Sequence, residues 1–182
     1  MPFSALLDAC VLIPIHLADL LLRLGEMDLY RPLWSAEVLD EVERNLPKMG
    51  VPPHLARKRV DAMRSCFPEA EVSGYEHLLP IMTNNPKDRH VLAAATHAKA
   101  KVITTSNLKD FPADALKPHG VNAVSPNDFL TDTFDRSPDQ TIDCLRAQHA
   151  KLRNPLVPLD EFCTRLGLNA PTFTSAVRPH LG

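Results

Sequence analysis

The clearest indication of how this chain folds is the sequence NPKDRHVLAAATHAKAKVITTSNLKDFP, residues 85–112. Within it, valine, leucine and alanine recur at helical spacing over 89–99, which predicts an amphipathic helix. The β-branched run 102–105 follows and predicts a short strand. The loop before the helix carries Asp88, and the loop after the strand carries Asp110. The stretch therefore predicts a helix and strand of an α/β fold, with one acid in each flanking loop.

The same alternation of short apolar runs and helical patterns extends along the preceding chain. Gly25 is expected to end the first long helix, and Ser35 is expected to cap the next one. The expected strands lie at 3–7, 30–34, 71–75, 102–105 and 121–124. The expected helices lie at 15–24, after Ser35, at 54–67 and 89–99, and from 125 onward. This order predicts an α/β fold with a mainly parallel sheet.

The pattern changes near the C-terminus to helices alone. Two helical segments are expected at 139–152 and 159–166, separated by a joint that contains prolines. We therefore expect two parts, an α/β domain at 1–131 and a helical extension at 132–182.

Composition limits the classes of protein that the chain can belong to. The 182 residues are 45% hydrophobic, carry a formal charge of −2, and suit one core of ordinary size. That charge does not mark the whole chain as a polyanion binder, so a nucleic-acid surface would be local. With no signal peptide or long apolar run visible, we expect a cytoplasmic protein. The widely spaced cysteines predict buried free thiols at Cys10, Cys66, Cys144 and Cys163.

Three aspartates are expected at the carboxyl ends of parallel strands. Asp8 ends the first strand, and Asp88 and Asp110 lie in loops at the same edge, where open α/β sheets place their ligands. Glu41, one turn into the second helix, could point across that edge. Such acids repel unless a cation neutralises them, and carboxylate oxygens suit Mg²⁺ or Mn²⁺. The sequence therefore indicates a magnesium or manganese site.

Each acid also has a purely structural interpretation. Asp88 could cap the helix at 89–99, and Asp110 could form an Asx turn before a proline. Glu41 cannot be chosen by spacing alone from the other acids of its helix, which are Glu37, Asp40 and Glu43. Only the common placement of the acids favours a functional role.

Four sequence motifs occur in order and resemble those of the PIN domain, the nuclease fold of VapC-type toxins. They are LLDACVL at 6–12, SAEVLDE at 35–41, NPKDRHVLAAA at 85–95 and ITTSNLKDFP at 103–112. The resemblance covers about residues 3 to 130. It implies a three-layer α/β/α fold with a mainly parallel central sheet, followed here by the C-terminal helical extension.

The resemblance also implies a function, a set of site residues and partners. It implies a Mg²⁺- or Mn²⁺-dependent endoribonuclease whose metal is held by Asp8, Glu41, Asp88 and Asp110. Thr105 and Asn107 would complete the catalytic set. Asn107 stands where many PIN domains carry aspartate, and it supplies no charge. The resemblance further implies an RNA substrate, a cognate antitoxin protein and a homodimer.

Basic residues lie beside the expected site, and a second function stays open. Lys87, Arg89 and Lys109 could bind an RNA backbone, together with His90, or could be solvated loop residues that balance nearby acids. A catalytically silent PIN-like module that binds RNA or protein is the alternative to a nuclease, and Asn107 keeps that alternative open.

Overall fold

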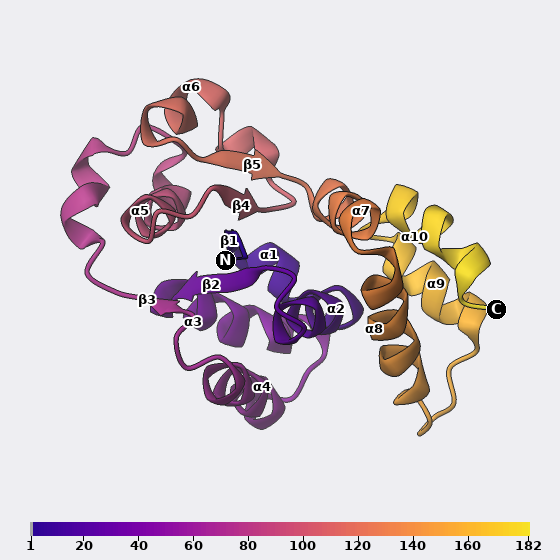
Figure 1. The fold of residues 1–182 in the computed structure, drawn as a ribbon. Helices are drawn as coiled ribbons and strands as arrows, with labels where there is room; N and C mark the ends of the chain where they lie inside the picture. The colour runs from indigo at the N-terminus through magenta and orange to yellow at the C-terminus, as the bar shows by residue number, and fades with distance from the viewer. Residues whose placement is uncertain (1) are drawn as a thin grey trace.

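The computed structural model describes residues 2–182, and a five-stranded sheet lies at its centre (Figure 1). The strands are β1 (Ser4–Leu7), β2 (Arg31–Ser35), β3 (Glu71–Val72), β4 (Val102–Thr104) and β5 (Asn122–Val124). Their spatial order is β3-β2-β1-β4-β5, and every neighbouring pair is parallel. The expected α/β fold is therefore confirmed, and its sheet is wholly rather than mainly parallel.

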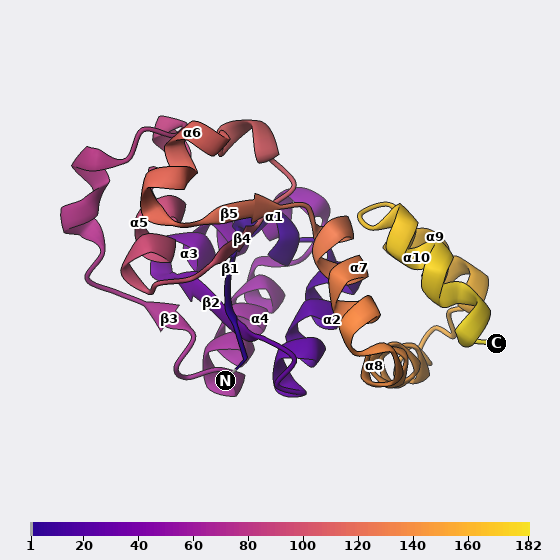
Figure 2. The ribbon, with the colours of Figure 1, turned by 45° about the horizontal axis from the view of Figure 1, so that its top comes forward.

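Helices flank this sheet (Figures 1 and 2). The α-helices are α1 (Ala9–Leu12), α2 (Ile15–Glu26), α3 (Ala36–Asn45), α4 (Pro53–Cys66), α5 (Arg89–His97), α6 (Ala113–Leu116), α7 (Pro126–Arg136), α8 (Pro138–Ala150), α9 (Leu159–Gly167) and α10 (Pro171–Val177). Short 3-10 helices span Leu46–Met49, Glu76–Ile81, Pro86–Asp88, Leu108–Asp110, Lys117–His119 and Arg178–His180. Helix α5 packs against β1, β2 and β4, while α2 and α3 contact β2. The expected three-layer arrangement is confirmed.

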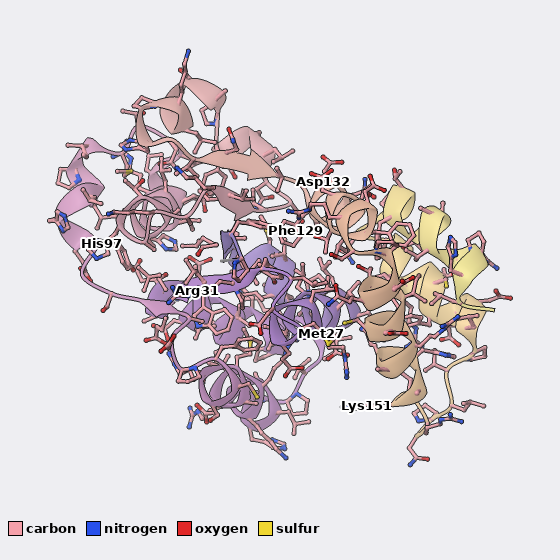
Figure 3. All side chains as sticks on the ribbon, viewed as in Figure 1. Met27, Arg31, His97, Phe129, Asp132 and Lys151 are labelled. Atoms are coloured by element: carbon pink, nitrogen blue, oxygen red, sulfur yellow. The ribbon has the colours of Figure 1, made fainter. Side chains whose placement is uncertain are left out.

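The core begins at β1, the central strand. Its residues Ala5, Leu6 and Leu7 are fully buried because helices cover both faces of a parallel sheet. At the N-terminal end of β1, where Phe3 contacts both rings, Phe129 of α7 meets Tyr30 edge to face, with ring centroids 4.9 Å apart. Figure 3 labels Phe129 at the junction between the sheet and the C-terminal helices.

The C-terminal helices α7 to α10 share this core (Figure 1). Gln148 of α8 donates from Nε2 to the carbonyl of His16 in α2, at 2.8 Å. Asn127 of α7 accepts backbone N–H bonds from Thr172 and Phe173 at the start of α10. The expected boundary between residues 131 and 132 lies inside α7 and stays a prediction. Within residues 2–182, no helix has both the length and the apolar character needed to cross a membrane.

Two expectations about single residues were wrong. Gly25 does not end its helix, since α2 continues through Glu26. A Cβ at Gly25 would lie 3.0 Å from the ring of Pro32, so the glycine permits a close approach of helix and strand. Cys66 is exposed rather than buried, because it closes α4 at the surface. Cys144 and Cys163 are buried, Cys10 is half-buried, and all four thiols are free.

The strand order brings two loops together at one edge of the sheet. The chain moves from β1 outward to β2 and β3, and then returns to the other side of β1 to form β4. This reversal makes the carboxyl ends of β1 and β4 the topological switch point, where ligands bind in open α/β sheets. Asp8 directly follows β1, and Thr105 directly follows β4.

Candidate active site

Asp8 is buried and is held from three directions. Its Oδ1 accepts the N–H of Ala9 at 2.7 Å and thereby caps α1. Its Oδ2 accepts the hydroxyl of Thr105 at 2.7 Å, across the switch point. The thiol of Cys10 donates to the same oxygen at 3.3 Å. The two loops at this edge are therefore joined through one carboxylate.

Cys10 contributes to this junction as a neutral thiol. Burial, followed by the charge of Asp8, raises its pKa to about 11. Its Sγ accepts the N–H of Ser106 at 3.2 Å, and it therefore bridges the loops that follow β1 and β4. The sequence indicated only a packing role for this residue.

Asp88 and Asp110 face each other across a single ammonium group. Lys87 Nζ lies 3.5 Å from Asp88 Oδ2 and 3.3 Å from Asp110 Oδ2. Both of these oxygens are buried, and neither accepts a hydrogen bond. Asn85 orders the pair from the side, because its Nδ2 donates to Asp110 Oδ1 at 2.9 Å.

The structural alternatives for these two aspartates do not account for their side chains. Asp88 stands at the N-terminus of α5, but its carboxylate makes no capping hydrogen bond. The Asp110 carboxylate accepts from Asn85, which is distant in sequence, rather than from a backbone N–H of its own turn. Neither carboxylate is therefore explained by local capping or turn formation.

The electrostatics of the two aspartates differ. Burial raises the pKa of Asp88, the charges of Asp8 and Asp110 raise it further, and Lys87 only partly opposes them. The hydrogen bond from Asn85 and the charge of Lys87 outweigh burial at Asp110, and its pKa is lowered. Asp8 and Asp110 are therefore both close enough to Asp88 to act on it electrostatically.

Glu41 is paired with a histidine. Its Oε1 lies 3.0 Å from Nε2 of His90, which is in the first turn of α5 and buried. Burial lowers the pKa of His90, but the hydrogen bond and charge of Glu41, together with Glu37 and Asp8, raise it overall. Glu37 in turn accepts the hydroxyl of Tyr75 at 2.9 Å.

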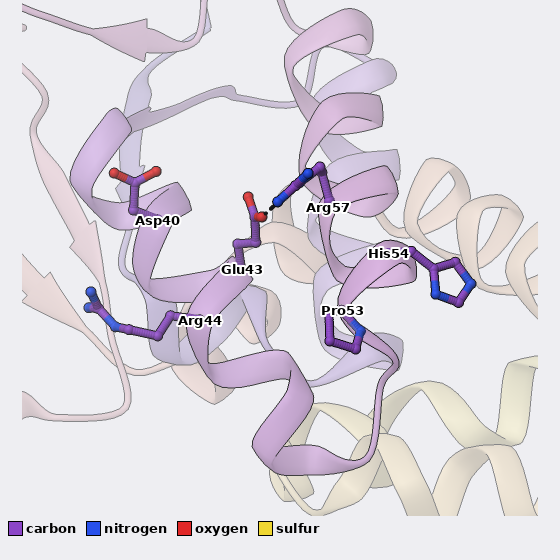
Figure 4. A pocket seen from close by; sticks show the side chains of 6 residues that line it. All are labelled: Asp40, Glu43, Arg44, Pro53, His54 and Arg57. Atoms are coloured by element: carbon purple, nitrogen blue, oxygen red, sulfur yellow. Dashed lines mark hydrogen bonds and ion pairs between the residues drawn. The ribbon is translucent and has the colours of Figure 1, made fainter.

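The acids of α3 are divided between two faces of the helix. Asp40 and Glu43 line a separate pocket of about 480 Å³ between α3 and α4, where Glu43 pairs with Arg57 (Figure 4). Glu37 and Glu41 instead lie against His90. Sequence spacing along the helix could not show which of these four acids belongs to the site. Their side-chain partners in the structure distinguish the two pairs.

The other candidate residues, Asn107, Arg89 and Lys109, lie in or next to the loops around the aspartates. The N–H of Asn107 donates to Thr105 Oγ1 at 3.0 Å, so Asn107 braces the residue that holds Asp8. Arg89 donates from Nε to the carbonyl of Asn84 and stabilises its own loop. Lys109 is exposed, and its charge helps to lower the pKa of Asp110.

The donor chemistry fits a hard divalent cation. In residues 2–182, no three Asp, Glu, His or Cys side chains are gathered closely enough to form a metal site as they stand. The Oδ2 atoms of Asp88 and Asp110 are nevertheless buried without a hydrogen bond, and the Lys87 ammonium group at 3.5 and 3.3 Å supplies one positive charge for the two carboxylates. Carboxylate oxygens are ligands that magnesium and manganese prefer.

Sequence reasoning missed the contributions of Asn85, Glu37 and Tyr75, and gave His90 a different role. Asn85 and Asp110 are 25 residues apart, and Tyr75 and Glu37 are 38 residues apart. The one sequence feature that could have indicated the contact with Glu41 was the histidine at position 90, two residues after Asp88 and on the buried side of its helix.

Comparisons with known proteins match two segments of the chain. Residues 4–109 match the PIN domain family, and residues 126–179 match a family described as the VapC50 C-terminal domain. A Mycobacterium tuberculosis H37Rv protein named "Putative ribonuclease VapC50" is 40% identical over 105 residues. That alignment covers 58% of this chain and 62% of the relative, so the chain spans less than two thirds of the relative's length. No solved structure matches the chain.

Proposed function

Because the chain belongs to the PIN domain family, we propose that it is a metal-dependent endoribonuclease whose active site lies at the carboxyl end of its sheet. One observation carries the proposal: the buried Oδ2 atoms of Asp88 and Asp110 accept no hydrogen bond and share the single charge of Lys87, and the charge of Asp8 also acts on Asp88. Such a set of carboxylates is stabilised by a hard cation. The relative named "Putative ribonuclease VapC50" supports the same activity.

We propose that Mg²⁺ or Mn²⁺ is bound by Asp8, Asp88, Asp110 and Glu41. A bound divalent cation lowers the pKa of water and stabilises charge on the attacking and leaving oxygens of a phosphodiester. Thr105 fixes Asp8 through the 2.7 Å hydrogen bond, and Asn107 fixes Thr105. These two residues therefore keep a ligand oxygen in place, as hydrogen-bonded neighbours of metal ligands commonly do.

The RNA backbone would be held by cations at the rim of this site. Lys87 is the strongest candidate, since its side chain is 62% exposed and its ammonium group already lies at the acids. Lys109 is exposed beside Asp110. Arg89 is a weaker candidate, because its side chain is half-buried and its Nε donates to the Asn84 carbonyl. Such contacts position a nucleic acid but do not read its sequence.

Two protein partners belong to the same proposal. The likeness to VapC-type proteins favours the toxin of a toxin–antitoxin pair, with an antitoxin protein that covers the acidic edge, and it favours a homodimer. We also propose that residues 132–182 act as a helical extension in one of these interfaces or in RNA selection.

The test is cleavage of a mixed cellular RNA pool by the purified protein with Mg²⁺, with Mn²⁺ and with EDTA. Asp8→Asn is the control for contaminating nucleases, and it keeps the capping oxygen of α1 because asparagine caps helices as well as aspartate. Cutting that requires a metal and is lost in this variant is the expected result. Inactivity with every metal would instead favour the silent binding module.

A further inference from the structure

The surroundings of His90 suggest a role beyond packing. The side chain is buried in the first turn of α5, and its Nε2 lies 3.0 Å from Glu41 Oε1. Its Nδ1 is buried and has no hydrogen-bond partner. Buried polar atoms are normally satisfied, so a histidine that only fills the core would rarely leave one ring nitrogen in this state.

The carboxylates on either side of the ring explain its position. Glu37 and Glu41 are one turn apart on α3, where two like charges destabilise a helix. His90 lies against both, with Nδ1 3.8 Å from Glu37 Oε2. Glu37 is itself fixed by the buried Tyr75, whose hydroxyl donates to Oε1 at 2.9 Å. The ring therefore rests on an ordered carboxylate on one side and contacts Glu41 on the other.

The chain around His90 links this arrangement to the aspartates. Asp88 lies two residues earlier, at the start of the same helix, and approaches Asp110 and Lys87. The N-terminus of α5 thus places Asp88 beside Asp110 and places His90 against Glu41. Any shift of this turn would move both groups together.

We propose that His90 is a positioning residue for Glu41, supported from behind by Glu37 and Tyr75, and that it sets the orientation in which Glu41 completes the metal site. This inference rests on the proposed function, since it gives Glu41 a metal to bind. His90 itself touches neither substrate nor metal in this account. Its contribution acts through the Glu41 carboxylate alone.

The test measures Mn²⁺ affinity by calorimetry and single-turnover RNA cleavage in His90→Gln, His90→Asn and His90→Leu. Glutamine carries an amide nitrogen near the place of Nε2 and can still bond Glu41, whereas asparagine reaches only the place of Nδ1. His90→Leu and His90→Asn are expected to lose about 10- to 100-fold in both measurements, the usual effect of removing a partner of a metal ligand. His90→Gln is expected to restore most of the loss.

Two comparisons separate positioning from a general structural effect. On a Glu41→Gln background, His90→Leu should cause little further loss, because the carboxylate through which it acts is gone. His97→Leu, an exposed change at the far end of α5, should leave both measurements unchanged. Thermal unfolding of each variant establishes that it is folded.

Three results would overturn the inference: wild-type affinity in His90→Leu, failure of glutamine to restore it, or full additivity with Glu41→Gln. If the wild-type protein binds Mn²⁺ and Asp8→Asn does not, any of these results removes the role of His90 alone. If neither the wild type nor any variant binds Mn²⁺, the proposed function fails and this inference fails with it.

Discussion

Replacing Thr105 by valine removes one hydroxyl from the junction between the two loops and preserves the shape of the side chain. Thr105 is fully buried, and its Oγ1 both donates to Asp8 Oδ2 and accepts the N–H of Asn107. Valine presents a methyl group to a buried carboxylate, which then loses its shortest side-chain donor. The change therefore tests whether this hydrogen bond holds Asp8 in place.

The expected magnitude follows from the type of hydrogen bond. The hydrogen bond from Thr105 to the Asp8 carboxylate involves a charged group, and such bonds stabilise a protein by about 1.5–3 kcal/mol. The bond from the Asn107 N–H matters less, because Asn107 is half-exposed and water can replace the lost acceptor. We expect Thr105→Val to lower the free energy of unfolding by about 2 kcal/mol, or Tm by about 4–8 °C for a chain of this size. Metal-dependent cleavage should fall about 10- to 100-fold.

The assay is urea unfolding in EDTA, followed by RNA cleavage in Mg²⁺. Thr105→Ser is the matched control, because it keeps the hydroxyl and loses only a methyl group, at a stability cost of about 1 kcal/mol. On an Asp8→Asn background the effect of Thr105→Val should shrink by about 1 kcal/mol, since the charged acceptor is gone. Wild-type stability and wild-type cleavage in Thr105→Val would show that this hydrogen bond does not hold Asp8 in place.

Three further changes give distinct outcomes. Burial raises the pKa of Asp88, so the fold loses stability as pH rises through that pKa and the carboxyl group ionises. Asp88→Asn removes this buried charge and should therefore raise Tm at pH 7 in EDTA while abolishing cleavage. A lower Tm in this variant would contradict the prediction. Asn107→Asp should tighten Mn²⁺ binding in calorimetry if its side chain faces the cation, whereas unchanged affinity would leave it as a brace for Thr105. Ser35 caps α3 through Val38, so Ser35→Ala should lower the free energy of urea unfolding by about 1 kcal/mol, and no loss would discount the cap.

Most of the fold could be predicted from the sequence because its signals are local. All five strands were anticipated to within a few residues, since buried β-branched and apolar runs alternate with helical patterns. The N-cap role of Ser35 was also anticipated, and Ser35 Oγ accepts the Val38 N–H at 3.2 Å. Helices α1, α6 and α10 were missed, because four to seven residues are too few to establish a helical period.

The site was only partly predictable, because its side-chain partners come from distant parts of the chain. The predicted strand ends were enough to place Asp8, Asp88 and Asp110 at one edge of the sheet. No local pattern could reveal that Asn85 orders Asp110 or that His90 pairs with Glu41. These contacts depend on how loops and helices pack, and their assignment to catalysis stays a prediction.

We propose that the three aspartates at the carboxyl end of the sheet hold a catalytic metal. The most direct test of this proposal is the rate of Mg²⁺-dependent RNA cleavage by Asp8→Asn, Asp88→Asn and Asp110→Asn, each compared with Asp114→Asn, an exposed acid of α6. We predict that the cleavage rate of each of the three variants falls at least about 100-fold, and that Asp114→Asn cuts RNA at the wild-type rate. A loss of about 100-fold is the upper end of what is seen when only a hydrogen-bond partner of a metal ligand is removed. Wild-type rates in the three site variants would show that these aspartates do not hold a catalytic metal.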